Sequence, residues 1–301
     1  MSLYAGKPIR TRVYIDGYNF YYGCLKRTPF KWLDPKALFT QILQTSQPNH
    51  LFDSAEPSVK YFTAPILKNF AKTADSISSQ ALYLQALRGH LCESIQIVEG
   101  YYSAERVWAN LCEKGEPPLA SERREVWKLV EKQSDVALSL SAYGDAMRNE
   151  VDHVVFVTHD TDLVPALELI RRDTCVKIGL VVPTRDHQRR VNTDLEKCAD
   201  WVRTHIPDFE LAAAQLPGMV KLGAKSVHKP LSWYPRPDLL EPIYLEAKRV
   251  KRSHGAALKW LSTPCMQLDG RFPIRMAESE AEADELSIYM LNYAKEFGLQ
   301  L

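Results

Sequence analysis

Residues 154–163 read VVFVTHDTDL, and this stretch decides the predicted fold. The four apolar residues Val154 to Val157 predict a strand that is buried on both faces, as inside a parallel sheet. A polar turn carrying Asp160 and Asp162 follows, and residues 163–172 then predict an amphipathic helix. Two carboxylates at the carboxyl end of a strand repel each other unless a cation joins them, and Mg²⁺ and Mn²⁺ prefer such oxygens. The alternative is that one aspartate caps the helix and the other is solvated.

Composition limits the possible classes of protein. The chain has 301 residues, enough for one large or two smaller domains, and 46% of them are apolar. Its net charge of +1 gives no overall preference for nucleic acid. Six cysteines without a CxxC pair argue against a disulfide framework and a zinc site. With no apolar leader and no run of 18 apolar residues, we expect a soluble, cytoplasmic protein.

Strands and helices are predicted to alternate along the first two thirds of the chain. Further strands are expected at residues 12–15, 59–63, 94–98 and 176–182. Helices are expected at 36–44, 73–88 and 192–202, and a long charged helix is expected from Ser121, with Val136 to Leu140 buried. This order predicts an α/β protein with a parallel sheet covered by helices on both faces. The polar excursion 101–120 either packs as a loop or lines a nucleic-acid groove with Tyr101, Tyr102, Arg106 and Trp108.

Two more acids occupy notable positions. Asp16 follows the first strand, with Asn19 beside it, although Asp-Gly is also an ordinary turn pair. Asp135 lies in the charged helix and needs a partner, either Lys132 or a metal ion shared with the other acids. The chain has no GxGxxG or GxxxxGK[ST] loop and no GxSxG elbow. Carboxylates at two strand ends and beside one helix are what divalent-metal phosphoryl chemistry requires.

Three segments together resemble a known family. They are YIDGYNFYY (14–22), EKQSDVAL (131–138) and FVTHDTDLVPAL (156–167), and they are similar to the NYN domain of the PIN-like nuclease superfamily over roughly residues 9–212. The resemblance implies a Rossmann-like α/β/α sandwich and Mg²⁺- or Mn²⁺-dependent cleavage of RNA. It also implies metal ligands at Asp16, Asp135, Asp160 and Asp162, with Asn19 and Thr158 completing the catalytic set.

The chain departs from this family pattern at two positions. His159 stands where relatives commonly have Gly or Asn, and it is a candidate general base or simply a surface histidine. Ser141 stands where many members have a further acid, and Asp145 lies one helical turn beyond it. A weaker second metal site, or a protein that binds RNA and regulates without cutting it, therefore stays open. Some relatives are named 6-hydroxy-3-succinoylpyridine hydroxylases, a flavin- or NADH-linked oxidation, which is a minor alternative.

The last third of the chain has a different character. Residues 213–240 are basic and contain prolines, which predicts a linker, and residues 241–301 predict a helical module that begins near Glu241. ALKWLSTPCMQLDGRFPIRMA (257–277) resembles the C-terminal domain of ParS/MbcA/Xre-type antitoxins, which implies a dimerising or partner-binding module. Phosphate contacts are expected from basic residues, unless these form a solvated face: Arg189, Arg190, Lys248, Arg249, Lys251 and Arg252.

Overall fold

The structure is a computed structural model that describes residues 8–71, 73, 75–112, 117, 121–186 and 190–296. The chain divides into two compact units. Unit 1 comprises residues 1–24 and 34–214, and unit 2 comprises residues 25–33 and 215–301.

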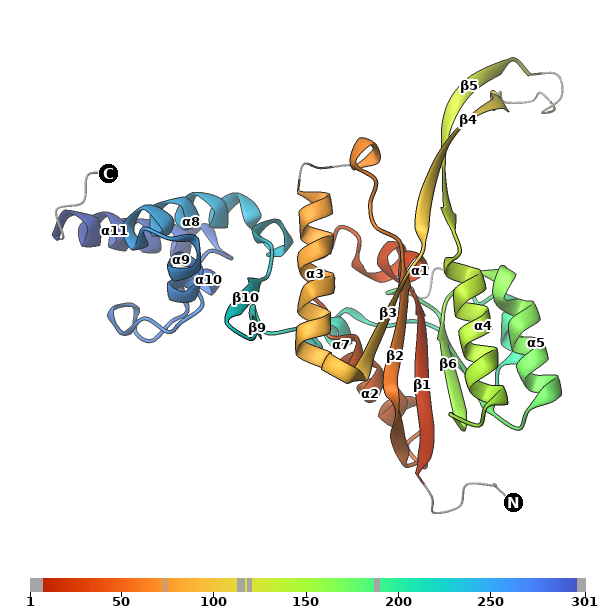
Figure 1. Cartoon of the computed structure of the whole chain (residues 1–301). Coiled ribbons are helices and arrows are strands. Elements are labelled where there is room, and N and C mark those ends of the chain that lie inside the picture. The colour runs from red at the N-terminus through yellow and green to blue at the C-terminus, as the bar shows by residue number, and fades with distance from the viewer. Residues whose placement is uncertain are drawn as a thin grey trace. The chain divides into compact units, whose positions relative to one another are not determined.

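Unit 1 is built on a six-stranded parallel sheet, which confirms the predicted α/β class (Figure 1). The strand order is β3-β2-β1-β6-β7-β8. The bounds are Ile9–Asp16 (β1), Phe52–Thr63 (β2), Ile95–Glu99 (β3), His153–Val157 (β6), Lys177–Val181 (β7) and Trp201–Arg203 (β8). The direction of winding reverses between β1 and β6. In open α/β sheets, ligands bind in the crevice at such a switch point, at the carboxyl ends of the strands.

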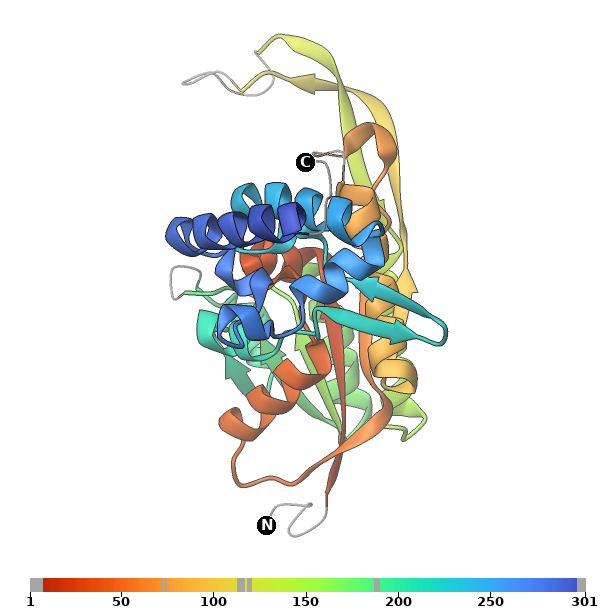
Figure 2. The same ribbon diagram turned by 90° about the vertical axis from the view of Figure 1, so that its left-hand side faces the viewer.

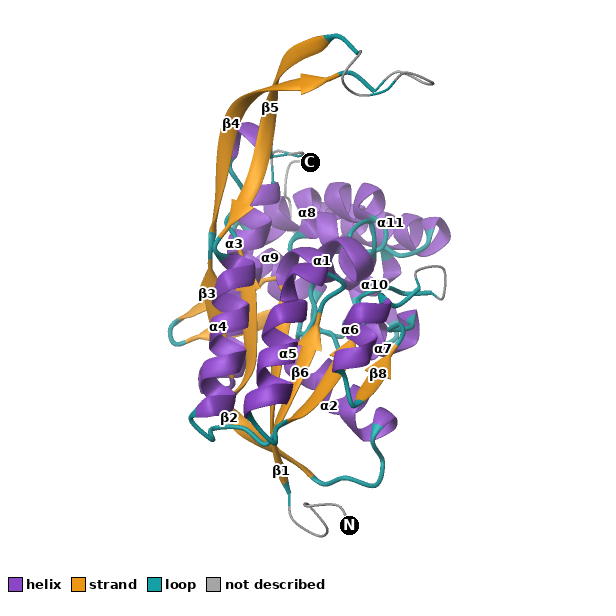
Figure 3. Cartoon of the chain, turned by 90° about the vertical axis from the view of Figure 1, so that its right-hand side faces the viewer, coloured by secondary structure: helices purple, strands orange, loops and turns teal. Residues whose placement is uncertain are grey.

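Helices cover both faces of this sheet, as expected (Figure 3). One face carries α2 (Pro35–Ser46), α3 (Ser76–Leu91) and α7 (Asp208–Ala213). The other carries α4 (Ser134–Met147), α5 (Val164–Asp173) and α6 (Thr193–Cys198). Short 3-10 turns lie at Pro29–Lys31, Lys68–Phe70, Cys92–Ser94, Thr161–Leu163, Leu231–Trp233 and Met266–Leu268.

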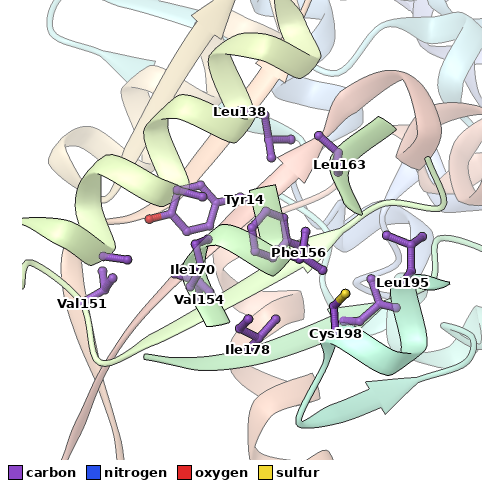
Figure 4. Close-up of a cluster of buried hydrophobic side chains, with 14 of the residues drawn as sticks. Tyr14, Leu138, Val151, Val154, Phe156, Leu163, Ile170, Ile178, Leu195 and Cys198 are labelled. Atoms are coloured by element: carbon purple, nitrogen blue, oxygen red, sulfur yellow. The ribbon is translucent and has the colours of Figure 1, made fainter. Parts of the chain in front are cut away.

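The core between the sheet and α4, α5 and α6 explains the apolar run at residues 154–157. Every residue of β6 is buried, because helices cover both sides of this central strand. Tyr14, Val154 and Phe156 extend from the sheet toward Leu138 of α4 and Leu163 before α5 (Figure 4). This packing fixes the positions at which β1 and β6 end.

Two helix predictions were wrong. Residues 123–132 form a strand, β5 (Arg123–Lys132), which pairs antiparallel with β4 (Tyr101–Asn110), and α4 begins only at Ser134. Residues 201–203 form β8 rather than the end of a helix. In β5 good helix formers lie in a strand, because pairing with a neighbouring strand outweighs local propensity, whereas Trp201 and Val202 of β8 are themselves residues that favour strands. The β4–β5 hairpin extends away from the carboxyl edge of the sheet (Figures 1 and 2).

The expected burial of residues 136–140 also needs correction. Val136 is 63% exposed and Leu140 is 67% exposed, whereas Leu138 is buried in the core. The helical period turns only one side of α4 toward the sheet, so apolar neighbours in the sequence can lie on its solvent side.

Unit 2 contains the predicted C-terminal helices, α8 (Pro237–Lys251), α9 (His254–Leu261), α10 (Pro273–Met276) and α11 (Glu280–Glu296). Their core contains Leu240, Leu258, Leu261 and Leu286. The stretch expected as a linker, 213–240, contains a small antiparallel pair, β9 (Met219–Leu222) with β10 (Lys225–His228). In the described part of the chain, no helix has the length and apolarity needed to span a membrane.

Candidate functional site

The candidate site lies where β1 and β6 end, at the switch point of the sheet. The parallel register pairs Ile15 with Val157, so Asp16 and Thr158 leave their strands side by side. The Thr158 hydroxyl donates a hydrogen bond to Oδ2 of Asp16 at 3.0 Å. The Thr158 hydroxyl oxygen in turn accepts the backbone N–H of Asp160 at 3.0 Å. Fully buried Thr158 therefore connects the two strand-end aspartates.

Asp16 is held in place from several sides. Its Oδ1 accepts the backbone N–H of Asn19 at 3.0 Å, which caps the short helix α1 (Gly17–Phe20). Its Oδ2 accepts the Asn19 side-chain amide as well as the Thr158 hydroxyl. Burial raises the pKa of Asp16, and these hydrogen bonds oppose that rise. A carboxylate offers about four acceptor positions, so Oδ1 keeps capacity for one more partner.

Asp160 and Asp162 have different surroundings. The Oδ1 of Asp160 accepts the backbone N–H of Asp162 at 3.0 Å and caps the turn Thr161–Leu163. Asp162 is exposed. The helix-cap alternative is thus correct for Asp160 and does not remove it from the site, because only one of its acceptor positions is used by the cap.

Asp135 completes a group of four carboxylates. It lies in the first turn of α4. Partial desolvation, together with the charges of Asp16, Asp160 and Asp162, raises the pKa of Asp135 to about 6. The charges of the three other predicted acids, which come from separate parts of the sequence, thus all act on Asp135. Lys132 is not the partner of Asp135, since its ammonium pairs with Glu105 at 3.0 Å.

Glu131 is an acid of the site that the sequence analysis missed. Its charge raises the pKa of Asp16, and its carboxylate accepts the Ser134 hydroxyl at 2.5 Å and the Tyr102 hydroxyl at 3.3 Å. It lies near the end of β5, four residues before Asp135. The predicted continuous helix gave no reason to group Glu131 with Asp135, because Glu131 belongs to a strand and Asp135 to the helix after it. The Tyr- and Trp-containing stretches on either side of a Gly/Pro tip were the signal for a hairpin.

The predicted basic residues and His159 are arranged as follows. The Nε2 of His159 donates to the backbone carbonyl of Arg190 at 2.9 Å, since a carbonyl oxygen can only accept. Arg189 lies outside the described residues. Lys248, Arg249, Lys251 and Arg252 belong to unit 2, at the end of α8. Lys251 lies over the rings of Trp260 and Tyr293, at 5.5 and 4.6 Å from their centroids.

Asp145 does not replace the acid missing at Ser141. It is fully buried, and its Oδ2 contacts Arg12 and Lys60 at 2.7 Å each and accepts the Tyr14 hydroxyl at 2.7 Å. These partners hold the pKa of Asp145 below its usual range, although burial itself acts in the opposite direction. Asp145 thus neutralises two buried cations of β1 and β2, a structural role.

The residues fit a divalent cation in charge and donor chemistry. All four carboxylates offer the hard oxygens that Mg²⁺ and Mn²⁺ prefer, and a cation would relieve the repulsion that Asp135 experiences from the other three. Among the residues that the structure describes, no three His, Cys, Asp or Glu side chains are grouped as a ready-made metal site. Asp16, Asp135, Asp160 and Asp162 would hold the ion.

A dinucleotide does not fit the turn after β1, where α/β folds bind its pyrophosphate. The carboxylate of Asp16 already occupies the amino end of α1 and would repel a phosphate. A Cβ on Gly17 would lie 2.4 Å from the Phe62 carbonyl oxygen, so this glycine allows close packing on β2 rather than the approach of a ligand. The turn is built around an acid.

Comparison with known proteins gives a family and, separately, a relative whose name states an oxidation. A 6-hydroxy-3-succinoylpyridine 3-monooxygenase, HspA, from Pseudomonas putida (strain DSM 28022 / S16) is 46% identical over 297 residues, which cover 94% of each chain. A solved structure of a Vibrio parahaemolyticus protein of unknown function is 18% identical, with 67% of this chain and 94% of that chain covered and a TM-score of 0.38, too low to support a conclusion. The NYN domain pattern matches residues 10–205, which contain every acid of the site. The chain belongs to the NYN domain family.

Proposed function

We propose that this protein is a divalent-metal-dependent ribonuclease whose site is the carboxylate group at the ends of β1 and β6. The observation that carries the proposal is the raised pKa of Asp135, caused in part by Asp16, Asp160 and Asp162. Buried or crowded acids at a switch point cost free energy and persist where function needs them. The NYN domain match supports nuclease-type chemistry.

Each residue has a role in this proposal. Mg²⁺ or Mn²⁺, when bound, supplies an activated water and neutralises charge on a phosphodiester. Asp16, Asp135, Asp160 and Asp162 hold the ion, while Asn19 and Thr158 keep Asp16 ionised and oriented. The charge of Glu131 acts on Asp16 and keeps the local field negative, which favours a cation. Arg189, Arg190 and the basic end of α8, at Lys248, Arg249, Lys251 and Arg252, would contact phosphates without reading sequence.

The test is cleavage of labelled single-stranded and hairpin RNA with Mn²⁺, Mg²⁺ or EDTA. Wild type is compared with Asp16→Asn and Asp160→Asn. Asp152→Asn is the matched control, because Asp152 lies at the amino end of β6, paired with Arg10. We expect metal-dependent cutting by wild type and control, and a loss of at least a hundredfold in both site variants. Cutting at the wild-type rate by a folded Asp160→Asn protein would end the assignment.

A second candidate is the oxidation of a pyridine substrate. It is favoured by the 46% identity to the Pseudomonas putida monooxygenase over nearly the whole chain. A monooxygenase puts one oxygen atom of O₂ into its substrate and the other into water, so it needs two electrons from a donor. Oxygen uptake that requires 6-hydroxy-3-succinoylpyridine and NADH, with or without added flavin, would support it. No uptake by protein that cuts RNA would reject it.

A third possibility belongs to another class, a regulatory RNA-binding protein that acts through the helices of unit 2. Ser141 suggests this possibility, because α4 then supplies the site with no acid besides Asp135. Asp145 cannot serve, since it is paired with Arg12 and Lys60. The antitoxin-like segment 257–277 would then contact a second copy or another protein. Retained RNA binding without turnover at any divalent metal would favour it over the nuclease.

A further inference from the structure

Three exposed tyrosines follow the site aspartate, and two of them, Tyr18 and Tyr22, lie on the same face. Asp16 caps α1, and a π-helical turn, Tyr21–Leu25, continues it. Tyr18 is 46% exposed and Tyr22 is 42% exposed. Their ring centroids are 4.5 Å apart, and their planes are inclined by 37°. Residues four apart on a helical segment share a face, so the two rings form one aromatic surface.

This surface is held rigidly by the backbone beneath it. Phe20, between the two tyrosines, is fully buried. A Cβ on Gly17 would lie 2.4 Å from the Phe62 carbonyl oxygen, and one on Gly23 would lie 1.7 Å from the Pro183 carbonyl oxygen. The backbone therefore packs closely against β2 and the loop after β7 at both ends of the segment. The aromatic surface is preorganised, which lowers the entropy cost of binding a ring.

A tyrosine from the hairpin connects the aromatic surface with the acids. Tyr102, at the base of the β4–β5 hairpin, donates its hydroxyl hydrogen bond to Glu131. Burial, Glu131 and then Tyr18 and Tyr22 raise the pKa of Tyr102, so these rings are its neighbours. Glu131 in turn acts on Asp16. The aromatic and acidic groups thus form one continuous site at the edge from which the hairpin extends (Figure 1).

We propose that Tyr18 and Tyr22 form a stacking platform for an unpaired base of the RNA substrate, so that the adjoining phosphodiester lies at the carboxylates. The proposal rests on the proposed ribonuclease function. Aromatic side chains bind single strands by stacking, because every base has a flat π-face. A base within a duplex is already stacked on its neighbours and presents only its edge. The site is therefore specific for unpaired segments.

The platform is tested with one RNA sequence, used single-stranded and annealed to its complement. Tyr18→Ala and Tyr22→Ala are compared with Tyr18→Phe and Tyr22→Phe, which keep a ring. Phe209→Ala is the control, since Phe209 is an aromatic residue that is 67% exposed and lies on α7, outside the proposed platform. We expect each Ala variant to raise KM for the single strand roughly five- to hundredfold, the range of one stacked base. The Phe variants and the control should stay near wild type.

A single abasic residue, moved along the strand, provides the matching change in the substrate. At one position it should reduce cleavage by wild type as much as Tyr18→Ala does, and it should cause no further loss in that variant. Ala variants that cut single strands like wild type, or that lose single- and double-strand cleavage equally, would overturn the platform while leaving the nuclease intact. No cleavage by folded wild type would instead overturn the function on which the platform rests.

Discussion

Thr158 joins Asp16 to Asp160: its hydroxyl donates to the carboxylate of Asp16 and accepts the backbone N–H of Asp160, each at 3.0 Å. One buried hydroxyl thus links the end of β1 with the turn after β6. A serine can make the same two bonds, whereas an aliphatic side chain can make neither. The relative position of the two acids depends on this bridge.

The Thr158 hydroxyl should be required for RNA cleavage, which substitutions with and without a hydroxyl can test. For Thr158→Val we expect a ten- to hundredfold loss of metal-dependent RNA cleavage, because a hydrogen bond to a charged group contributes about 1.5–3 kcal/mol. Thr158→Ser should stay within a few-fold of wild type. Steady-state kinetics and thermal melting of the two variants provide the measurement. Equal activity of the Val and Ser variants would show that the bridge has no role in catalysis.

Asp145 should matter for the fold and not for the chemistry. Asp145→Asn removes the carboxylate that Arg12 and Lys60 share in the interior, which leaves Lys60 without its ion pair and Arg12 with Glu150 alone, and costs roughly 3–5 kcal/mol. Asp152→Asn removes a surface pair with Arg10 and should cost less than about 1 kcal/mol. Urea unfolding of both variants checks the difference. An Asp145→Asn protein as stable as wild type would contradict the assignment of Asp145 as a structural anion.

His153 should make the protein less stable in acid. It is fully buried, accepts the Trp201 indole N–H at 3.0 Å and contacts Thr11, and burial lowers its pKa to about 3. Between pH 6.5 and 3 the unfolded chain binds a proton at this position while the folded chain does not. Stability from this group is therefore complete above pH 6.5 and falls by about 1.4 kcal/mol per pH unit below it.

His153→Gln provides the measurement, because an amide keeps a donor and an acceptor but does not titrate. As the pH falls from 6.5 to 4, we expect the free energy of unfolding of wild type to decrease more steeply than that of the variant. Above pH 7 the two proteins should show the same pH dependence. Parallel curves over the whole range would mean that His153 takes up its proton in the folded protein.

The ionised carboxylate of Asp135 should destabilise the folded protein when no cation is bound. Its folded pKa of about 6 lies above the unfolded value, so the ionised group costs stability above pH 6, and the cost disappears as pH falls below 4. Because the side chain is exposed, screening limits the effect to below about 1 kcal/mol. Asp135→Asn in EDTA should melt about 2 °C higher than wild type at pH 8 and no higher at pH 4. Saturating Mn²⁺ should reverse the order at pH 8, because only wild type gains its ligand.

Local sequence was sufficient to predict those features that depend on the residues of a single strand or helix. The apolar run at 154–157 determined a central buried strand, and the polar residues after it determined where the strand ends. The same held for Asp16 after β1, so the α/β class and three of the four acids followed from strand ends alone. These patterns are reliable because burial on both faces leaves little choice of residue.

Only the tertiary structure decided the rest. Residues 123–132 have the composition of a helix and form a strand, because β4 supplies a pairing partner that local sequence cannot reveal. That pairing places Tyr102 against Glu131, whose charge acts on Asp16, and it directs Lys132 to Glu105 rather than to Asp135. Asp145 and Ser141 lie on the same helix, yet buried cations from two strands determine that Asp145 is structural. The sequence by itself determined which acids end the strands. Which of them share one electrostatic site depends on strand order and pairing across the sheet, and these are set by contacts between residues far apart in the chain.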